Sequence, residues 1–402
     1  MDIVENRFGM FVHWGIYALT GLHEQAFARY DMDRSEYEAL ASKFNPTKFD
    51  ADALVHLAKE AGMEYICFTA KHHDGFCMWN TRYTDFNIMN TPYAKDILLE
   101  LADACKRQDM KLSIYYSNPD WHEKTAYNSL SSHQWRADFR ELSDIGSYRQ
   151  YIKNQITELL TNYGPIYSLF WDIPPCVEDK SINELARKLM PGILINDRGW
   201  DHGDFSTPER ETPEGAHFTK LTEACQSVGR QSWGYRKDED YYSAGFLMQS
   251  IDKVMAMGGS YLLNIGPMAD GRIPSKAKRI VKRIGKWYNC VNDSLEDTFP
   301  DERSYKILDN PPFIAVTKNK KTYLHFYNGL NTTAVTFIEC PEVPKSAKLM
   351  NTGRTLRVRN EMLPMVHFDD KRGVIDSPTV SLADIPIDNI AGEPIVIEIN
   401  WY

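Results

Sequence analysis

The sequence predicts an α/β fold, a (β/α)8-like TIM barrel with some irregularity, followed by a C-terminal antiparallel β-sandwich. Apolar segments of strand length alternate with amphipathic helical segments through the first three quarters of the chain. These apolar segments are continuous rather than alternating, which is typical of parallel strands buried on both faces. Beyond residue 298 the helical spacing ends, and the short β-branched segments that follow are typical of an antiparallel sandwich.

The barrel elements follow one another along the chain. The first strand is predicted at 8–14 (FGMFVHW), and the later strands at 63–70, 111–117, 166–172, 192–198 and 260–267. The helices between them are predicted at 50–62, 96–108, 147–163, 181–190 and 244–258. The stretch 200–243 is irregular, so eight regular units cannot be counted. A barrel is favoured over an open doubly wound sheet because no GxGxxG motif follows the first strand.

Two domains are expected because 402 residues exceed the size that one core usually reaches. The boundaries predicted from the change in pattern are 1–298 for the catalytic barrel and 299–402 for the sandwich. Segments such as FIAVTK, TYLHFYN and IVIEIN supply the strands of the second domain. Its expected role is to pack against the barrel, with glycan binding as the alternative.

Composition excludes several classes of function. A net charge of −9 argues against a nucleic-acid partner, which requires clustered Lys and Arg. No stretch of apolar residues is long enough to span a membrane. The seven Cys form no CxxC pair, which favours free thiols over a zinc site. No signal peptide is recognisable, so the chain as it stands is expected in the cytoplasm, or outside it if a signal was removed. The oligomeric state cannot be read from the sequence.

Polar side chains gather where the predicted strands end. In a barrel these carboxyl ends form one rim, where active sites lie. The strand ends contribute His13, then His72 and His73, then Tyr115 and Tyr116, then Asp172, and last Arg198. A purely structural barrel does not require His, Arg and carboxylates at successive strand ends, so we expect a catalytic or binding site there.

Asp172 is the first candidate for a catalytic group. An aspartate at this position could cap a helix, but Pro174 and Pro175 follow at once and no helix begins before about residue 181. A retaining glycosidase would need a second carboxyl group about 5–5.5 Å away. Glu209, Glu211 and Glu214 in the irregular stretch are the candidates, and the residues alone do not choose among them.

The paired histidines raise the question of a metal. A barrel metallohydrolase would usually carry an HxH pair, whereas the first strand offers one histidine, in HWG. Hydrogen bonding to sugar hydroxyls explains the histidines more simply. We therefore do not expect a catalytic metal.

Several motifs together resemble the α-L-fucosidases of glycoside hydrolase family 29. The matching segments are RFGMFVHWGIY (7–17), FTAKHHDGFCMW (68–79), NYGPIYSLFWD (162–172), INDR (195–198), TPE (207–209), SWGY (232–235) and GGSYLLNIGPMADGRIP (258–274). The resemblance covers residues 1–300 in consistent order. It implies a retaining exo-glycosidase that removes terminal α-L-fucose from glycans by double displacement, on a barrel with a C-terminal β-sandwich, without metal or cofactor.

The resemblance also implies roles for individual residues. The nucleophile falls on Asp172, and the acid/base falls on Glu209 ahead of Glu211 and Glu214. The expected contacts to fucose hydroxyls are His13, His72 and His73, joined by Tyr116, which is preferred to Tyr115. Arg198 is expected near the anomeric side of the sugar. Phe11, Phe170 and Trp233 fall on the pocket for the C6 methyl group. Glu24 is the counterpart of a family glutamate that contacts the sugar, but Gln25 follows it where the family often has Trp.

Two other interpretations remain open at this stage. The chain could be a catalytically inactive barrel that binds fucose or another glycan, or a retaining glycosidase that acts on a different sugar. The two carboxylates favour an enzyme. The linkage that is cleaved cannot be derived from the sequence.

Overall fold

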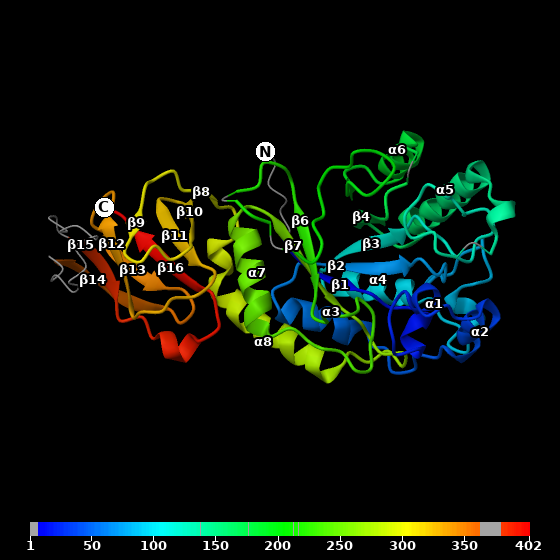
Figure 1. Cartoon of the computed structure of the whole chain (residues 1–402), viewed down its shortest axis with the longest axis horizontal. Helices are drawn as coiled ribbons and strands as arrows, with labels where there is room; N and C mark the ends of the chain where they lie inside the picture. The colour runs from blue at the N-terminus through cyan, green and yellow to red at the C-terminus, as the bar shows by residue number, and fades with distance from the viewer. Residues whose placement is uncertain (1–6, 137, 176, 212, 216, 362–378) are drawn as a thin grey trace.

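The computed structural model describes residues 7–136, 138–175, 177–211, 213–215, 217–361 and 379–402. Figure 1 shows a helix-rich part with a parallel sheet, and beside it a part built of strands. The first residues of the predicted barrel (1–6) and one segment of the predicted sandwich (362–378) lie outside the described residues.

The described residues of the first part form a seven-stranded parallel sheet in the order β5-β4-β3-β2-β1-β7-β6. Its strands are β1 (Phe8–Val12), β2 (Tyr65–Lys71), β3 (Lys111–Ser117), β4 (Ile166–Asp172), β5 (Leu194–Ile195), β6 (Glu223–Ser227) and β7 (Ser260–Ile265). Because all seven run in the same direction, their carboxyl ends meet at one edge.

Helices pack on one face of this sheet. They are α3 (Ala51–Glu60), α4 (Ile97–Arg107), α5 (Ile145–Asn162), α6 (Lys180–Leu189), α7 (Ala244–Ala256) and α8 (Ser275–Val291). Two short helices, α1 (Ala26–Arg29) and α2 (Arg34–Glu38), precede them in the chain. Side chains cap the amino ends of α3, α4, α5 and α6, each through an aspartate that accepts from a backbone N–H. None of the helices in the described ranges is long and apolar enough to cross a bilayer.

The two faces of the parallel sheet bury different side chains. Val12, Phe68 and Tyr116 point toward the helices and belong to the main core. Phe11, Tyr115 and Phe170 occupy the alternate positions and form a separate cluster on the opposite face, which we call the inner face. Since side chains alternate along a strand, this assignment also decides which residues at the strand ends can meet over the inner face.

The stretch 200–243, predicted to be irregular, contains one strand that the sequence analysis missed. β6 reads EACQS, and its Glu223 and Gln226 are buried polar residues, so the segment lacks the apolar signal of a strand. The segment 205–209 makes single parallel bridges to Asn196 on one side and to Thr222 and Cys225 on the other. It therefore connects the two edge strands of the sheet without being a regular strand itself.

The C-terminal part is a nine-stranded sheet within the described residues, and all its pairs are antiparallel. Its strands are β8 (Phe299–Pro300), β9 (Lys306–Ile307), β10 (Ile314–Lys318), β11 (Lys321–Phe326), β12 (Ala334–Glu339), β13 (Ser346–Leu349), β14 (Arg354–Glu361), β15 (Thr379–Ala383) and β16 (Ile395–Asn400). β14 pairs with β13 through 354–356 and with β15 through 357–361. Apolar side chains from both halves of this sheet, such as Leu324 and Phe337, share one core.

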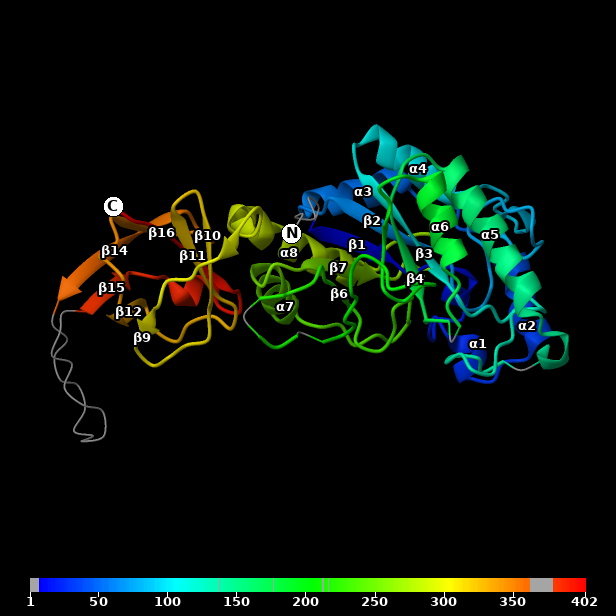
Figure 2. The ribbon, with the colours of Figure 1, turned by 90° about the horizontal axis from the view of Figure 1, so that it is seen from above.

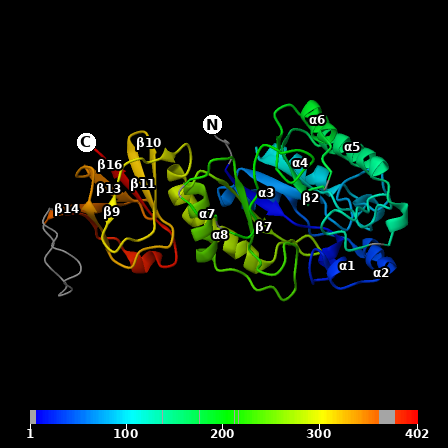
Figure 3. The same cartoon turned by 45° about the horizontal axis from the view of Figure 1, so that its top comes forward.

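The two parts meet through α7 and α8, which lie between the sheets in two perpendicular views (Figures 1 and 2). Asp252 on α7 and His325 on β11 are both fully buried, and their Oδ1 and Nδ1 atoms lie 2.8 Å apart. Val316 and Val396 of the antiparallel sheet join the main core of the first part. The strand β2 lies away from this contact, on the side of α1 and α2 (Figures 1 and 3), and β1, β3 and β4 run parallel to it.

Candidate active site

A cavity of about 180 Å³ lies over the inner face, at the carboxyl ends of the parallel strands. Its lining residues come from β1, β3, β4 and β6 and from the loops that follow the strands, including the loop after β2. They are Phe11, His13, Gln25, His72, His73, Tyr115, His133, Phe170, Asp172, Ile173, Arg198, Glu209, Cys225 and Trp233. The cavity thus unites most of the side chains predicted for the site.

Asp172 ends β4 on the inner face and is held by several donors. The Tyr115 hydroxyl donates to its Oδ2 at 2.6 Å, and Nη1 of Arg198 donates to its Oδ1 at 3.1 Å. His73 Nε2 lies 3.7 Å from Oδ2. Burial acts to raise the pKa of Asp172, but His73, Arg198 and the Tyr115 hydrogen bond outweigh it, and the pKa lies below its usual value. The carboxylate is therefore ionised at neutral pH.

The backbone turns sharply after this aspartate. Ile173 has a φ of 59°, a left-handed conformation that is costly for a β-branched residue. In this conformation its N–H donates to Asp172 Oδ1 at 2.9 Å. Asn118 Nδ2 donates to the Ile173 carbonyl at 2.9 Å and to the Arg198 carbonyl at 3.2 Å, which ties the two loops together. Backbone strain of this kind is often held at functional sites, where it orients a reacting group.

Arg198 brings a second carboxylate to Asp172. Its Nη1 donates to Glu209 Oε2 at 2.9 Å as well as to Asp172 Oδ1 at 3.1 Å. Two atoms at those distances from a shared nitrogen are at most about 6 Å apart, which is below the range of about 6.5–9.5 Å that inverting glycosidases use. The Glu209 side chain is 40% exposed and that of Asp172 only 14%, so Glu209 faces the solvent side of the cavity.

The other two candidate glutamates lie elsewhere. Glu211 is exposed and does not line the cavity. The side chain of Glu214 is 95% exposed and pairs with Lys253 on α7 at 3.3 Å. Of the three glutamates, only Glu209 is placed within reach of Asp172.

Two histidines present fixed ring nitrogens to the cavity. His13 Nδ1 lies 2.7 Å from Asn264 Oδ1, and Asn264 uses its Nδ2 to donate to Ser227 and to the Trp233 carbonyl. His73 Nδ1 lies 2.6 Å from Ser117 Oγ, which donates to a backbone carbonyl. Burial lowers the pKa of both histidines to about 4. Both rings are therefore neutral with the proton on Nδ1, and each Nε2 is a hydrogen-bond acceptor.

His72 and His133 complete the polar wall. The His72 ring is stacked on Tyr115 with centroids 5.7 Å apart, and burial lowers its pKa well below the usual value. His133 comes from the loop after β3, and its ring centroid lies 5.5 Å from that of His73. His133 was not predicted, because it lies far from any strand end in the sequence.

Aromatic rings form the apolar side of the cavity. Phe11 lies between Phe170 and Trp233, with centroid distances of 5.2 Å and 6.2 Å. Arg210 covers the Trp233 ring at 4.5 Å from its centroid. These three aromatics, expected around a methyl group, therefore lie together and line one cavity.

The structure corrects the placement of Tyr116. Its side chain points to the helix side of the sheet, where its hydroxyl donates to Gln155 of α5 at 2.6 Å. Tyr115, the alternative in the sequence analysis, lines the cavity instead. The reason is the alternation of side chains along β3, which places neighbouring tyrosines on opposite faces.

Glu24 is also placed differently from the expectation. It is 1% exposed and does not line the cavity. Its Oε2 accepts hydrogen bonds from the Ser232 hydroxyl and from the backbone N–H groups of Trp233 and Gly234, at 2.6–3.2 Å. Glu24 therefore holds the loop that carries Trp233, and its neighbour Gln25 lines the cavity.

Gln25, Ile173 and Cys225 are further lining residues that the sequence analysis did not single out. Cys225 lies on β6, which was not predicted as a strand, so no sequence signal pointed to it. Within the described part of the chain, no group of three or more His, Cys, Asp and Glu residues has the arrangement of a metal site.

Two carboxylates held this closely around one arginine, in a cavity lined by histidines and aromatic rings, define the class of the protein as a glycoside hydrolase. The comparison with protein families agrees and is more specific. The family model described as Alpha-L-fucosidase matches residues 3–293, and the chain belongs to this family.

Relatives of known structure cover nearly the whole chain. The structure of α-L-fucosidase isoenzyme 1 from Paenibacillus thiaminolyticus is 27% identical, with a TM-score of 0.86 over 99% of this chain and 97% of that one. A family 29 α-L-fucosidase from Bacteroides thetaiotaomicron, trapped as a covalent intermediate with 2-fluoro-fucosyl fluoride, is 25% identical, with a TM-score of 0.76 over 98% and 94%.

Among curated proteins, the α-L-fucosidase of Branchiostoma floridae is 26% identical over 333 residues, which are 74% of this chain and 72% of that protein. The matched part of such relatives ranges from 66% to 77% of their own length.

Proposed function

We propose that this protein hydrolyses terminal α-L-fucose from fucosylated glycans with retention, with Asp172 as nucleophile and Glu209 as acid/base. The observation that carries the proposal is the pair of carboxylates that share Arg198 Nη1 at the mouth of a cavity of sugar size. The covalent intermediate trapped in the Bacteroides thetaiotaomicron relative supports the same double displacement here.

In the first step the Asp172 carboxylate attacks the anomeric carbon while Glu209 donates a proton to the glycosidic oxygen, and the leaving sugar departs. In the second step Glu209 removes a proton from water, the hydroxide adds to the anomeric carbon, and the bond to Asp172 breaks. The lowered pKa of Asp172 suits a nucleophile that must be ionised. The greater exposure of Glu209 suits a group that meets both the leaving sugar and water.

Fucose specificity would come from the two sides of the cavity. The Nε2 atoms of His13 and His73 are acceptors for sugar hydroxyls, because each Nδ1 proton is already used within the protein. On the other side Phe11, Phe170 and Trp233 offer an apolar surface to the C6 methyl group, which distinguishes fucose from sugars with a hydroxyl at that carbon. A site built in this way rejects sugars that leave its polar groups unpaired.

Two variants test the assignment with an aryl α-L-fucoside as substrate. Asp172→Ala removes the nucleophile, and we expect kcat to fall by at least about 10³-fold. Glu209→Gln keeps the shape but cannot donate a proton, so slowing of about 10²–10⁴-fold is expected with poor leaving groups and much less with good ones.

Near-normal turnover by Asp172→Ala would remove the basis for its role, and equal slowing with all leaving groups would point away from Glu209. If the wild type releases nothing from the fucoside, an aryl-glycoside panel and fucose calorimetry would separate another sugar specificity from a binding barrel.

We also propose finer features of the fold. The bridges from segment 205–209 to both edges of the parallel sheet support a barrel that this segment completes in place of a regular strand. The common core of the antiparallel sheet and the switch of partners along β14 support a β-sandwich. The domain boundaries proposed are 1–298 and 299–402.

A further inference from the structure

Each of the two proposed catalytic carboxylates is followed directly by a residue in the left-handed region. Ile173 follows Asp172 and has a φ of 59°. Arg210 follows Glu209 and has a φ of 55°. Residues other than glycine rarely adopt this conformation, and they keep it only where their surroundings enforce it. The contacts that enforce each turn therefore show what holds each carboxylate in place.

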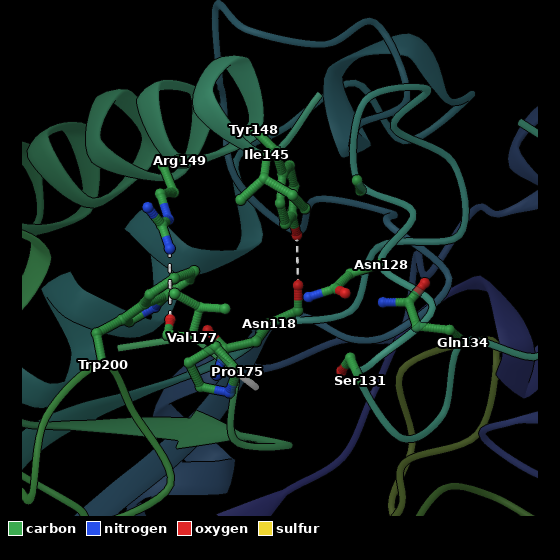
Figure 4. Close-up of a pocket in the computed structure, with 11 residues that line it drawn as sticks. Asn118, Asn128, Ser131, Gln134, Ile145, Tyr148, Arg149, Pro175, Val177 and Trp200 are labelled. Atoms are coloured by element: carbon green, nitrogen blue, oxygen red, sulfur yellow. Dashed lines mark hydrogen bonds between the residues drawn. The ribbon is translucent and has the colours of Figure 1, made fainter. Parts of the chain in front are cut away.

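The turn after Asp172 is held by a neighbouring strand end. Asn118, which directly follows β3, donates from Nδ2 to the Ile173 carbonyl at 2.9 Å. Asn118 is itself fixed, because the Tyr148 hydroxyl of α5 donates to its backbone carbonyl at 2.5 Å (Figure 4). The nucleophile thus has an anchor that belongs to another segment of the chain.

The turn after Glu209 is fixed to β6. The Cys225 N–H donates to the carbonyl of Pro208 at 3.0 Å, and the N–H of Arg210 donates to the Cys225 carbonyl at 2.9 Å. These two hydrogen bonds stand on either side of Glu209 and form its bridge to Cys225. Cys225 lines the catalytic cavity, so the backbone of Glu209 is held beside the wall of that cavity.

The side chain of Arg210 makes a second attachment. Its Nη1 donates to the carbonyls of Gly229 and Arg230, at 3.2 Å and 3.0 Å. Its guanidinium lies over Trp233, 4.5 Å from the ring centroid. In an extended strand this side chain would point to the face opposite that of Glu209, and the left-handed turn redirects it. Arg210 therefore joins the Glu209 segment to the loop that carries Trp233.

The Glu209 carboxylate depends on its backbone for its position. The side chain is 40% exposed, and in the part of the chain that the structure describes its carboxylate has a hydrogen bond to Arg198 alone. Arg198 also donates to Asp172, so it orients the Glu209 carboxylate without fixing the segment that carries it. The place of that segment is set by Cys225 and Arg210.

We propose that Arg210 is a positioning residue for the acid/base carboxylate. Its guanidinium holds the turn after Glu209 and, through the same contacts, the aromatic ring of Trp233. Proton transfer to the leaving group and recognition of the C6 methyl group are then coupled through one side chain. A guanidinium suits this role, because it donates within its plane and stacks on a ring through its face. The inference rests on the function proposed above, in which Glu209 is the acid/base.

The test uses leaving groups of graded quality, because acid assistance matters most for poor ones. Arg210→Met keeps the length of the side chain and removes its guanidinium. We expect kcat/KM to fall about 10–100-fold for phenyl α-L-fucoside and less than about threefold for a chloronitrophenyl α-L-fucoside, whose leaving group needs little acid assistance.

A second readout follows the methyl side of the cavity. The α-L-galactoside that corresponds to each fucoside carries a hydroxyl at C6. Because Arg210→Met removes the group that covers Trp233, the ratio of kcat/KM for the fucoside to that for the galactoside should fall by about threefold or more.

Arg230→Met is the matched control. Arg230 lies in the same loop, its side chain is exposed and does not line the cavity, and it meets Arg210 through its backbone carbonyl. We expect wild-type rates from this control with every substrate. Arg210→Lys keeps the charge but not the planar fork, so it should resemble Arg210→Met. Wild-type rates in Arg210→Lys would show that charge alone suffices and would overturn the proposal.

Two further variants separate this proposal from its neighbours. Asn118→Ala loosens the turn after Asp172 and should slow good and poor leaving groups alike, because all of them need the nucleophile. If Arg210→Met gives that same pattern, or no slowing at all, the proposal is overturned. Glu209→Gln is measured in parallel, and if it too slows all leaving groups alike, the acid/base assignment itself fails.

Discussion

The adjacent tyrosines of β3 allow a sharp test of how the nucleophile is held. Tyr115→Phe removes the hydroxyl that donates to Asp172 Oδ2 at 2.6 Å. Burial raises the pKa of Tyr115 well above its usual value, so this hydroxyl is protonated and donates at every relevant pH. Because the hydrogen bond stabilises the ionised carboxylate, its loss must raise the pKa of Asp172.

The size of the shift follows from the strength of the bond. A hydrogen bond to a charged group contributes about 1.5–3 kcal/mol, and one pKa unit corresponds to about 1.36 kcal/mol. Arg198 and the Ile173 N–H still donate to the carboxylate in the variant, so we expect the lower end of this range, a rise of about one unit in the pKa of Asp172. Below this pKa the nucleophile is protonated. The acid limb of kcat/KM should therefore move to higher pH by about one unit, and activity on that limb should fall about tenfold.

The assay is kcat/KM for an aryl α-L-fucoside as a function of pH, which reports ionisations of the free enzyme. Tyr116→Phe is the matched control. It removes one hydroxyl from the next residue of the same strand, but that hydroxyl donates to Gln155 on the helix side of the sheet. We expect this control to lose about 1 kcal/mol of stability and to keep the acid limb of the wild type. Superimposable acid limbs for Tyr115→Phe and the wild type would refute the reasoning.

Three further predictions concern buried carboxylates. Glu24→Ala leaves the three donors in 232–234 unpaired, so the loop that carries Trp233 loses its anchor. KM should rise, and the free energy of unfolding, measured with urea, should fall by about 3 kcal/mol. An unchanged KM would contradict the anchoring role of Glu24. Burial raises the pKa of Glu223 to about 7, so this residue lowers stability as pH rises from about 4.5 to about 7. Glu223→Gln should remove this pH dependence, which amounts to a loss of up to about 3 kcal/mol in the free energy of unfolding. If the free energy of unfolding changes with pH in the same way for the variant and the wild type, the raised pKa of Glu223 is not the cause. Asp120→Ala removes the partner of Lys71, which pairs with Asp120 at 2.7 Å, and leaves a buried, unpaired charge. The free energy of unfolding, measured with urea, should fall by about 3–5 kcal/mol. A fall of less than about 1 kcal/mol would be inconsistent with a buried ion pair.

The regular parts of the fold could be predicted because their signals are local. The strand predicted at 111–117 coincides with β3, and the helix predicted at 147–163 corresponds to α5 within two residues at each end. Continuous apolar segments between amphipathic helices lead to a parallel sheet whatever the details of the loops. β6 escaped prediction because it buries the polar side chains of Glu223 and Gln226, and the hydroxyl that pairs with Glu223 comes from Tyr65, far away in the sequence.

Some residues of the candidate active site could likewise be identified from the sequence, whereas others needed the structure. Asp172 and the histidines were identified from their positions at strand ends, and the resemblance to a family singled out Glu209 among the three candidate glutamates. The choice between Tyr115 and Tyr116 needed the three-dimensional structure, because both residues stand at the same strand end and differ only in the face they occupy. Glu24 shows the same limit, since a glutamate that contacts a sugar and one that anchors a loop look alike in a sequence.

The sequence by itself determined the order of elements, the edge of the sheet that carries the chemistry and the kinds of side chain found there, because periodicity and strand ends are local properties. Only the tertiary structure showed how Glu209 approaches Asp172, which lies 37 positions earlier in the chain: Nη1 of Arg198 donates to both carboxylates. It also decided the neutral state of His13 and His73, because burial is a property of everything packed around a side chain. Pairings and burial depend on long-range contacts, and these exist only once the chain has folded.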